Sequence, residues 1–572
     1  MATTTTIHCL NLGRDIATEK GSTARDLALR LENELGFTPL LARINNRYEN
    51  LSYDFYHPAQ VEFLSLGSTA GQRAYLHSLT FMISAAAEEL FPGSRFHLKY
   101  SVSNGYYCKL YFADLDPLRG QMPPEELSAL ARGKILERLE PLKARVKALA
   151  AQAIPFEGVE EETSQVMDLF ERQGRPDVQD ILGESGQLYT TYYRMGDHID
   201  YYFGPLVHDT GQVALFNLIP YLNGLLLSIP DRKAPERLAS TVKQEKMHQV
   251  FQEYTKWNRL MEIPSVGAMN RAIAAGGAST LIKVGEALQE KRIARIADDI
   301  TQRPGVKVIL IAGPSSSGKT TFSKRLSVAL SVNGLHPIAL SLDDYFVERE
   351  ETPLDENGRY DFESFHTLDL KLFNTQLKAL LAGEKVNIPS FDFAAGRKVY
   401  RPDRWLQLKE NDILLMEGIH ALNPDLVPDI DPSTQYRIYA SALTTLTLDR
   451  HNPIPTTDNR LLRRIIRDCK YRGTPCAQTL DRWASVRAGE EKWIFPFQEN
   501  ADAIFNSALV FELSVLKPFV EAELQKVPQQ APEYAEARRL LRLLSHLLPI
   551  QADEIPSTSL LREFVGGSSF SY

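Results

Sequence analysis

A strand-like run followed by a glycine loop stands at Val306-Lys-Val-Ile-Leu-Ile-Ala-Gly-Pro-Ser-Ser-Ser-Gly-Lys-Thr-Thr321. Its first part, Val306–Ala312, is typical of a strand buried in a parallel sheet. Gly313–Thr320 then matches the pattern G-x-x-x-x-G-K-S/T at every position, and a helix is predicted over 321–332. A strand, a glycine loop and a helix in this order predict a phosphate-binding loop. The alternative is a chance Gly/Ser loop.

The chemistry of such a loop comes from its backbone and from two side chains. Glycines let backbone N–H groups converge on phosphate oxygens, and the following helix adds the partial positive charge of its N-terminus. Lys319 is expected to neutralise the β- and γ-phosphates, and the Thr320 hydroxyl to ligate Mg²⁺. We therefore expect ATP to contact Gly313, Pro314, Ser315, Ser316, Ser317, Gly318, Lys319, Thr320 and Thr321.

Two later strands are each predicted to end in a carboxylate. The strand at 337–341 is followed by Asp343 and Asp344, and the strand at 412–416 is followed by Glu417. Ligands of open α/β sheets bind at this carboxyl-terminal edge. We interpret Asp343 as the base that accepts the proton of an attacking hydroxyl, and Glu417 as a second Mg²⁺ ligand. An ordinary turn role is the alternative for both.

Residues 458–472 predict a helix with two unlike faces. Its arginines recur at spacing i, i+3, i+4, i+7, opposite an apolar face: Arg460, Arg463, Arg464 and Arg467 against Leu461, Leu462, Ile465 and Ile466. Such a row of guanidinium groups suits a lid that closes over transferring phosphates. We expect Arg463 to bind the nucleotide and Arg464 and Arg467 to act in catalysis. The alternative is a solvated basic face.

Composition limits the classes of function. The net charge of -8 excludes a global basic field that would hold nucleic acid. Cys9, Cys108, Cys469 and Cys476 are not spaced for metal binding and indicate reduced thiols. The N-terminus lacks a signal-peptide pattern, and no apolar run approaches the roughly 20 residues of a bilayer span. A cytoplasmic protein without a membrane partner is expected.

The pattern along the chain predicts a multidomain protein. The expected units are a small strand-rich domain at 1–65, an α+β domain at 66–235, a helical connector at 236–299, an α/β kinase domain with a parallel sheet at 300–525, and a helix with a tail at 526–572. The tail from Leu560 to Tyr572 is unusually apolar for a free terminus. We expect it to dock on the body of the protein.

Residues 306 to about 515 resemble the uridine kinase and phosphoribulokinase family of P-loop kinases. The motifs that carry the resemblance are the phosphate loop, Ser341-Leu-Asp-Asp-Tyr345, Tyr360-Asp361, Ile388-Pro-Ser-Phe-Asp-Phe393, Glu417-Gly-Ile419 and Arg460-Leu-Leu-Arg-Arg-Ile-Ile-Arg-Asp468. The resemblance implies that Asp343 is the catalytic base, that Asp361 holds ribose hydroxyls, and that Phe391 and Arg397 line the substrate site.

The chain departs from that family where uridine kinases read the base. Phe391 replaces a tyrosine, and Gly396 replaces a base-reading histidine. A buried site discriminates between substrates largely through such polar groups. The resemblance therefore implies ATP as donor and leaves the phosphate acceptor open.

The N-terminal half resembles threonyl-tRNA synthetases. Residues 1–65 resemble their ubiquitin-like TGS module, a β-grasp domain, through Ala42–Leu51 and Val61–Leu64, and 66–235 resemble their editing module. That module carries a metal-binding constellation of which only His77 remains here, because the other positions read Phe81, Tyr202 and Leu206. The resemblance implies a degenerate module that neither binds a metal nor hydrolyses aminoacyl-tRNA.

Two classes of function follow. The leading hypothesis is an ATP- and Mg²⁺-dependent kinase that phosphorylates a hydroxyl of a nucleoside or related small metabolite. The alternative is a nucleotide-regulated RNA- or ribosome-binding protein, which is not favoured because acidic residues outnumber basic ones across 1–235. Whether the N-terminal half senses a ligand, and whether the protein forms a homo-oligomer, are left open.

Overall fold

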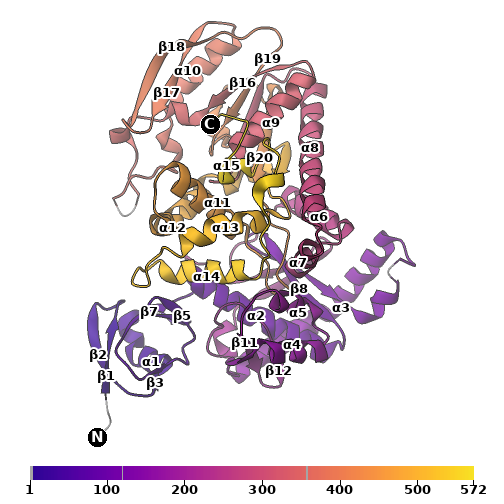
Figure 1. Cartoon of the computed structure of the whole chain (residues 1–572), viewed down its shortest axis with the longest axis vertical. Coiled ribbons are helices and arrows are strands. Elements are labelled where there is room, and N and C mark those ends of the chain that lie inside the picture. The colour runs from indigo at the N-terminus through magenta and orange to yellow at the C-terminus, as the bar shows by residue number, and fades with distance from the viewer. Residues whose placement is uncertain (1–3, 119, 356–357, 572) are drawn as a thin grey trace.

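The computed structural model of the chain describes residues 4–118, 120–355 and 358–571. Figure 1 shows an elongated molecule with the indigo and purple N-terminal half at one end and a pink and orange α/β part at the other. The yellow C-terminal helices lie between them. Within the described ranges, every helix is too short or too polar to cross a membrane.

The α/β part is built on a parallel five-stranded sheet. Its strands, in spatial order, are β16 (His336–Ser341), β19 (Asp412–Glu417), β15 (Val308–Ala312), β20 (Gln435–Ser441) and β21 (Ala503–Asn506). All neighbouring pairs are parallel, and every residue of β15 is buried. The predicted parallel α/β sheet is therefore confirmed for this part of the chain.

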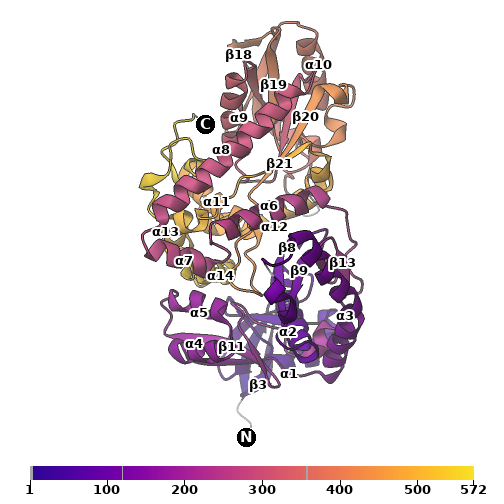
Figure 2. The same cartoon turned by 90° about the vertical axis from the view of Figure 1, so that its right-hand side faces the viewer.

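Helices cover both faces of this sheet. The face that contains Ile309 and Ile311 packs against α8 (Ala278–Gln302) and α9 (Lys319–Val332). The opposite face packs against α6 (Glu245–Leu260) and α10 (Leu370–Leu381). Figure 2 shows α8 running diagonally along the sheet. Burial on both faces explains why β15 reads as a continuous apolar run rather than an alternating one.

A helical layer lies beyond the β20–β21 side of the sheet. It consists of α7 (Val266–Ala274), α11 (Thr456–Tyr471), α12 (Cys476–Trp493), α13 (Glu512–Leu524), α14 (Tyr534–Ser545) and α15 (Arg562–Val565), which share one apolar cluster. Leu560, Leu561 and Phe564 are fully buried in this part of the molecule. The apolar tail therefore docks on the body, as expected from its composition.

The N-terminal half contains two regions. The first has a five-stranded sheet in the order β2 (Arg14–Glu19), β1 (Thr4–Cys9), β7 (Ala59–Leu64), β4 (Leu41–Ile44) and β5 (Arg47–Glu49), with α1 (Ala24–Leu35) and the short strands β3 (Ser22–Thr23) and β6 (Asp54–Phe55). Strands β1 and β7 are parallel, whereas β1–β2, β4–β7 and β4–β5 are antiparallel.

The second region combines two antiparallel sheets with helices. One sheet is formed by β13 (Asn217–Tyr221), β14 (Gly224–Ser228), β9 (Gly105–Tyr111) and β8 (Arg95–Val102), and the other by β10 (Glu157–Glu162), β11 (Tyr189–Met195) and β12 (His198–Asp200). The helices are α2 (Thr69–Leu90), α3 (Pro124–Gln152), α4 (Thr163–Arg172) and α5 (Pro176–Gly183). Helix α3 was not predicted from the sequence. It contains Pro141, and proline usually interrupts helices.

The loop between β20 and α11 joins the two halves. His451 of this loop is buried in the second N-terminal region, where its Nδ1 lies 2.6 Å from Asp200 Oδ2 and its Nε2 lies 3.1 Å from the Phe96 carbonyl oxygen. Arg175 Nη1 donates to the other oxygen of Asp200 at 2.7 Å. The His451 ring also stacks on Tyr202, whose ring stacks on His77. His451, which comes from the C-terminal half, thus packs beside Tyr202, one of the positions at which the expected metal ligands are absent.

A second ion-pair chain runs from the N-terminal half to the start of α11. Arg73 of α2 pairs with Glu536 of α14 at 2.9 Å. Glu536 also pairs with Arg539, which contacts both oxygens of Asp458 at 2.7 and 2.8 Å. Helix α11 is therefore attached to the N-terminal half through its preceding loop and through α14.

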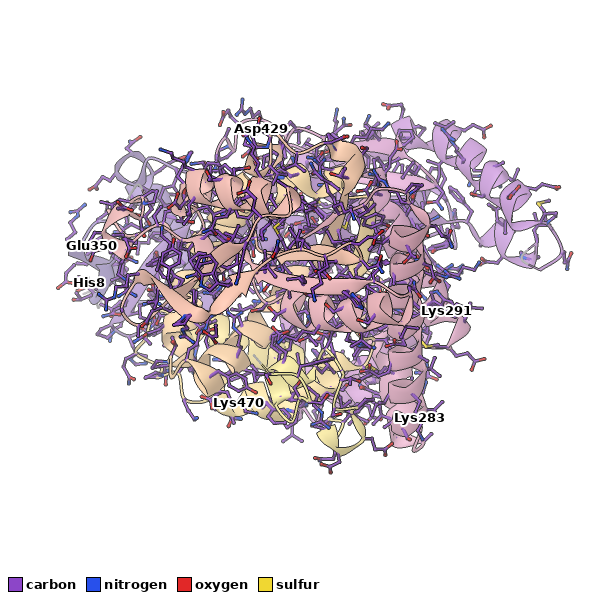
Figure 3. All side chains as sticks on the ribbon, turned by 90° about the horizontal axis from the view of Figure 1, so that it is seen from above. His8, Lys283, Lys291, Glu350, Asp429 and Lys470 are labelled. Atoms are coloured by element: carbon purple, nitrogen blue, oxygen red, sulfur yellow. The ribbon has the colours of Figure 1, made fainter. Side chains whose placement is uncertain are left out.

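Replacement of His451 by alanine should destabilise the protein by about 2–4 kcal/mol. The change leaves the buried Asp200 carboxylate with fewer partners and the Phe96 carbonyl without its ring contact. Urea unfolding of the full chain measures the effect. His8→Ala, at an exposed site labelled in Figure 3, is the matched control and should change stability by less than about 0.5 kcal/mol. Equal effects of the two changes would contradict the assigned role of His451.

Candidate active site

The phosphate loop connects β15 to α9 at the carboxyl-terminal edge of the sheet. Ser316 (φ 58°) and Gly318 (φ 80°) adopt left-handed backbone conformations that bend the loop around its centre. A Cβ atom at Gly313 would lie 2.0 Å from the Ala440 carbonyl oxygen of β20. The first glycine of the motif is therefore required by close packing of the loop on the neighbouring strand.

Two loop side chains lie where the motif predicts them. Lys319 Nζ donates to the carbonyl oxygens of Gly313 at 2.9 Å and Pro314 at 3.4 Å, so its ammonium group lies within the loop. Thr320 Oγ1 donates to Glu417 Oε1 at 3.0 Å. The predicted Mg²⁺ ligands Thr320 and Glu417 are thus brought together from α9 and the end of β19.

Asp343 and Glu417 share the environment of Lys319. Asp343 lies in the short 3₁₀ turn Leu342–Tyr345 after β16, the strand next to β19. Burial raises the pKa of both carboxyls, and the Lys319 ammonium opposes this rise at each of them. The Asp343 charge further raises the pKa of Glu417. The predicted base and the predicted metal ligand are both half-buried and therefore lie in one acidic environment beside the loop.

These residues suit Mg²⁺ held partly by phosphate oxygens better than a metal whose ligands all come from protein side chains. Within the described residues, no set of three or more His, Cys, Asp or Glu side chains is arranged to hold a metal ion. Mg²⁺ is commonly held by one or two carboxylates together with phosphate oxygens. The hard-oxygen donors Thr320 and Glu417 supply such a partial set, which a nucleotide phosphate would complete.

Glu363 is a further carboxylate of the site that the sequence analysis missed. Its Oε2 is shielded from solvent and has no hydrogen-bond partner among the described residues. Burial, reinforced by the Glu490 carboxylate, raises the pKa of Glu363 to about 7, while Arg464 and Lys319 oppose the rise. A carboxylate with one shielded, unpaired oxygen near the loop lysine has the environment of a group that contacts a ligand. The sequence feature that could have indicated Glu363 is its position two residues after Asp361.

Asp361 stabilises the turn that carries Glu363. Its Oδ1 accepts the Glu363 backbone N–H at 3.2 Å, and its carbonyl oxygen accepts the Ser364 N–H at 3.2 Å. This is a common role for aspartate. Substrate binding by Asp361 stays a prediction, and Glu363 is a second carboxylate of the same turn.

Arg464 and Arg467 of α11 face the site. Arg464 Nη1 donates to Ser315 Oγ at 2.7 Å. Arg467 lies close enough to lower the pKa of Asp343, and its guanidinium pairs with Asp468 at 3.1 Å. Both side chains are mostly buried, so α11 already lies against the phosphate loop rather than forming an open, solvated lid.

Arg463 differs from the expectation. It is fully buried and donates two hydrogen bonds to Glu512, at 2.8 and 2.6 Å. Its Nη1 also lies 3.5 Å from the Ser316 carbonyl oxygen. A guanidinium that is buried and paired in this way supports the loop from beneath. The expected lid position of Arg463 over the nucleotide is therefore corrected.

Arg460 and Glu490 support the other side of the loop. Both are buried; Arg460 donates to the two carboxylate oxygens of Glu490 and, at 3.2 Å, to the Ser315 carbonyl oxygen. Glu490 in turn accepts the Ser315 backbone N–H at 3.1 Å. The four arginines that the sequence predicts on one face of α11 thus have two roles. Arg460 and Arg463 hold the loop. Arg464 and Arg467 face the site.

The hairpin of β17 (Val386–Asp392) and β18 (Arg397–Leu406) flanks the site. Phe391 lies in an aromatic group with Phe346, and its N–H donates to Asp344 Oδ1 at 3.2 Å. Arg397, at the start of β18, is exposed. Gly396 adopts φ 69°, and a Cβ there would lie 2.8 Å from the Arg349 side chain. Arg349 therefore packs where the sequence analysis noted the loss of a base-reading histidine.

Comparisons with known proteins give matches for the C-terminal part of the chain. Residues 308–513 match the model of the Phosphoribulokinase / Uridine kinase family. The uridine kinase of Halobacterium salinarum is 28% identical over 220 residues, which cover 38% of this chain and 88% of that protein. The uridine kinase of Staphylococcus aureus strain JH9 is 29% identical over 199 residues, covering 34% and 86%.

Among solved structures, the "Possible Uridine Kinase" of Bacillus stearothermophilus is 21% identical, with a TM-score of 0.27, and the match covers 38% of this chain and 97% of that one. The family match starts at residue 308 and therefore concerns the C-terminal part alone.

Glu363→Gln should stabilise the protein at pH 8 and leave its stability nearly unchanged at pH 5. The folded-state pKa of about 7 lies above the ordinary value of 4.5, so the free energy of unfolding of the wild type falls as pH rises between these values. Glutamine removes this penalty, giving a gain of about 1–2 kcal/mol at pH 8. Urea unfolding at the two pH values measures it.

The control for this experiment is Glu350→Gln. Glu350 is exposed and labelled in Figure 3. Its replacement should have a small effect that is the same at pH 5 and pH 8. A Glu363→Gln effect that does not grow with pH would show that the Glu363 carboxyl ionises as it does in water.

Proposed function

We propose that this protein is an ATP-dependent kinase that transfers the γ-phosphate to a hydroxyl of a nucleoside or related small metabolite, because residues 308–513 match the model of the Phosphoribulokinase / Uridine kinase family. The observation that carries the proposal is the Thr320–Glu417 hydrogen bond beside Lys319 and Asp343. It joins a phosphate loop to a carboxylate pair at the edge where α/β sheets bind ligands.

The proposed chemistry follows from these residues. Lys319 and the loop N–H groups bind the phosphates, and Arg464 and Arg467 stabilise the charge that develops during transfer. Asp343 accepts the proton of the acceptor hydroxyl; its raised pKa makes it a stronger base than a solvated aspartate. Thr320 and Glu417 would hold Mg²⁺, which supplies charge neutralisation on the phosphates when bound. Positioning and electrostatics supply the catalysis, as is general for phosphoryl transfer.

The acceptor should be a polyhydroxylated molecule. Glu363 Oε2 is an unpaired acceptor near Asp343, and a carboxylate in this position suits a pair of neighbouring hydroxyls. The Arg349 side chain lies against Gly396 and donates to the Phe393 carbonyl oxygen, so this guanidinium is engaged within the protein. Recognition of a pyrimidine base by the hairpin turn therefore has little support, whereas recognition of a sugar has more.

The N-terminal half is proposed to be a scaffold. The strand order of residues 4–64 is that of a ubiquitin-like β-grasp, which supports the proposed TGS-like module. In the editing-like region, His77, Phe81, Tyr202 and Leu206 are all buried, and His451 covers the Tyr202 ring. This packing favours a part that supports α11 over an open catalytic cleft. RNA binding by this half stays an untested alternative.

Asp343→Asn should reduce kcat by about 10²–10⁴-fold and leave the Kd for ATP within about threefold of the wild type. Asparagine keeps the shape of the side chain but cannot accept the hydroxyl proton. ADP release, measured with ATP–Mg²⁺ and a panel of nucleosides, pentoses and other sugar alcohols, gives the rate, and calorimetry gives the affinity.

The matched control for this variant is Asp429→Asn, at an exposed aspartate labelled in Figure 3 that pairs with Lys378. It should turn over at the wild-type rate. Full activity of Asp343→Asn would remove Asp343 as the base. A folded wild-type protein that releases no ADP with any acceptor of the panel would contradict the proposed kinase activity.

A further inference from the structure

The end of the chain lies on the phosphate loop. A Cβ atom at Gly318 would lie 2.8 Å from Leu560 Cδ2, so Leu560 covers the loop's last glycine. Three residues later, Glu563 Oε2 accepts a hydrogen bond from Thr321 Oγ1 at 2.5 Å. Thr321 lies in the first turn of α9, directly after Lys319 and Thr320. The segment therefore contacts the part of the loop that the sequence analysis assigned to ATP.

Contacts with α11 and α9 hold this segment in place. The Arg463 guanidinium lies 5.1 Å from the centre of the Phe564 ring, a cation–π distance. Lys470, labelled in Figure 3, donates to the Val565 carbonyl oxygen at 2.7 Å. Lys324 of α9 contacts the Ser571 carbonyl oxygen. Figure 1 shows the yellow segment with α15 beside α11, ending near the kinase sheet.

The segment places a negative charge at the part of the loop that would bind phosphates. It presents the Glu563 carboxylate to the first turn of α9, where the helix dipole and the loop favour an anion. Its Phe564 ring packs on the Arg463 guanidinium, which supports the loop from beneath, and this contact holds the segment against the loop. Glu563 lies close enough to Glu417 to raise the pKa of that carboxyl. A phosphate chain bound along the same turn would meet a carboxylate of like charge.

We propose that residues 559–571 are an autoinhibitory strap that occupies part of the nucleotide site and must move before ATP binds with full affinity. The inference rests on the proposed function, because it assumes that ATP is the ligand of the loop. Displacement would break the Glu563–Thr321 hydrogen bond and expose Leu560 and Phe564. This cost would make the protein bind ATP weakly until the strap is released.

The local structure of the strap suits displacement. Helix α15 is a single turn, Arg562–Val565, and it is followed by Gly566 (φ 90°) and Gly567 (φ 74°). Consecutive glycines in left-handed conformations allow the chain to change direction at low cost. No strand of the described sheets contains a residue after Asn506, so the strap can leave without breaking a β-ladder.

The test compares ATP binding by full-length variants. Glu563→Gln removes the competing charge but keeps the shape of the side chain, so its Kd for ATP–Mg²⁺ should be about tenfold lower than that of the wild type. A chain that ends at Thr558 should bind at least as tightly. Glu554→Gln is the control, because it makes the same charge change at an exposed site five residues before the strap. It should match the wild type.

Hydrogen exchange measured by mass spectrometry reports the movement directly. Saturating ATP–Mg²⁺ should increase exchange in 560–566 while it protects 313–321. Unchanged protection of 560–566 in the ATP complex, or equal Kd values for the wild type and Glu563→Gln, would overturn the strap.

The strap and the proposed function fail in different ways. Tight ATP binding by Glu563→Gln without ADP release on any acceptor would support the strap and reject the kinase reaction. Normal turnover with equal Kd values in all variants would support the kinase and reject the strap. ATP binding by none of the variants would reject both.

Discussion

Two buried arginine–glutamate pairs hold the phosphate loop in place. Arg460 with Glu490 and Arg463 with Glu512 place charged groups on either side of the loop, and each arginine also reaches a loop carbonyl oxygen. A guanidinium in so dry an environment must keep its carboxylate partner, because a lone buried charge is strongly destabilising. The loop, α11, α12 and α13 therefore have to adopt one mutual arrangement, and the positions of Lys319, Thr320 and Asp343 follow from it.

This arrangement extends to the N-terminal half. Helix α11 begins at the end of the loop that carries His451, and its Asp458 is held by Arg539 of α14. The same α14 contacts Arg73 of α2 through Glu536. A displacement of the N-terminal half would therefore pull on both the entry to α11 and its first turn. The two halves share a mechanical element even though their sheets are separate, which gives a physical basis for coupling between them.

The sequence predicted the parts of the site whose local pattern is sufficient. The order of strand, glycine loop and helix was enough to predict where Lys319 and Thr320 lie. The ends of two strands were enough to predict that Asp343 and Glu417 lie at one edge of the sheet, because parallel strands bring their carboxyl ends together. Sequence spacing could not show that Glu363 has an unpaired oxygen near Lys319, because the orientation of the Asp361 and Glu363 side chains depends on a turn. It also could not show that Arg463 is buried, because that depends on Glu512, a residue far along the chain. The periodicity of a sequence does not show which residues far apart in the chain will be in contact.

The position of α14 has a consequence for biosynthesis. Glu536 and Arg539 lie more than 400 positions after Arg73, yet they connect Arg73 of the second N-terminal region to Asp458. Synthesis proceeds from the N-terminus, so this bridge cannot form until α14 has been synthesised. The contact of His451 with Asp200 can form earlier, because both residues precede α11. The connection through Glu536 is therefore added to an arrangement that the His451 loop has already begun.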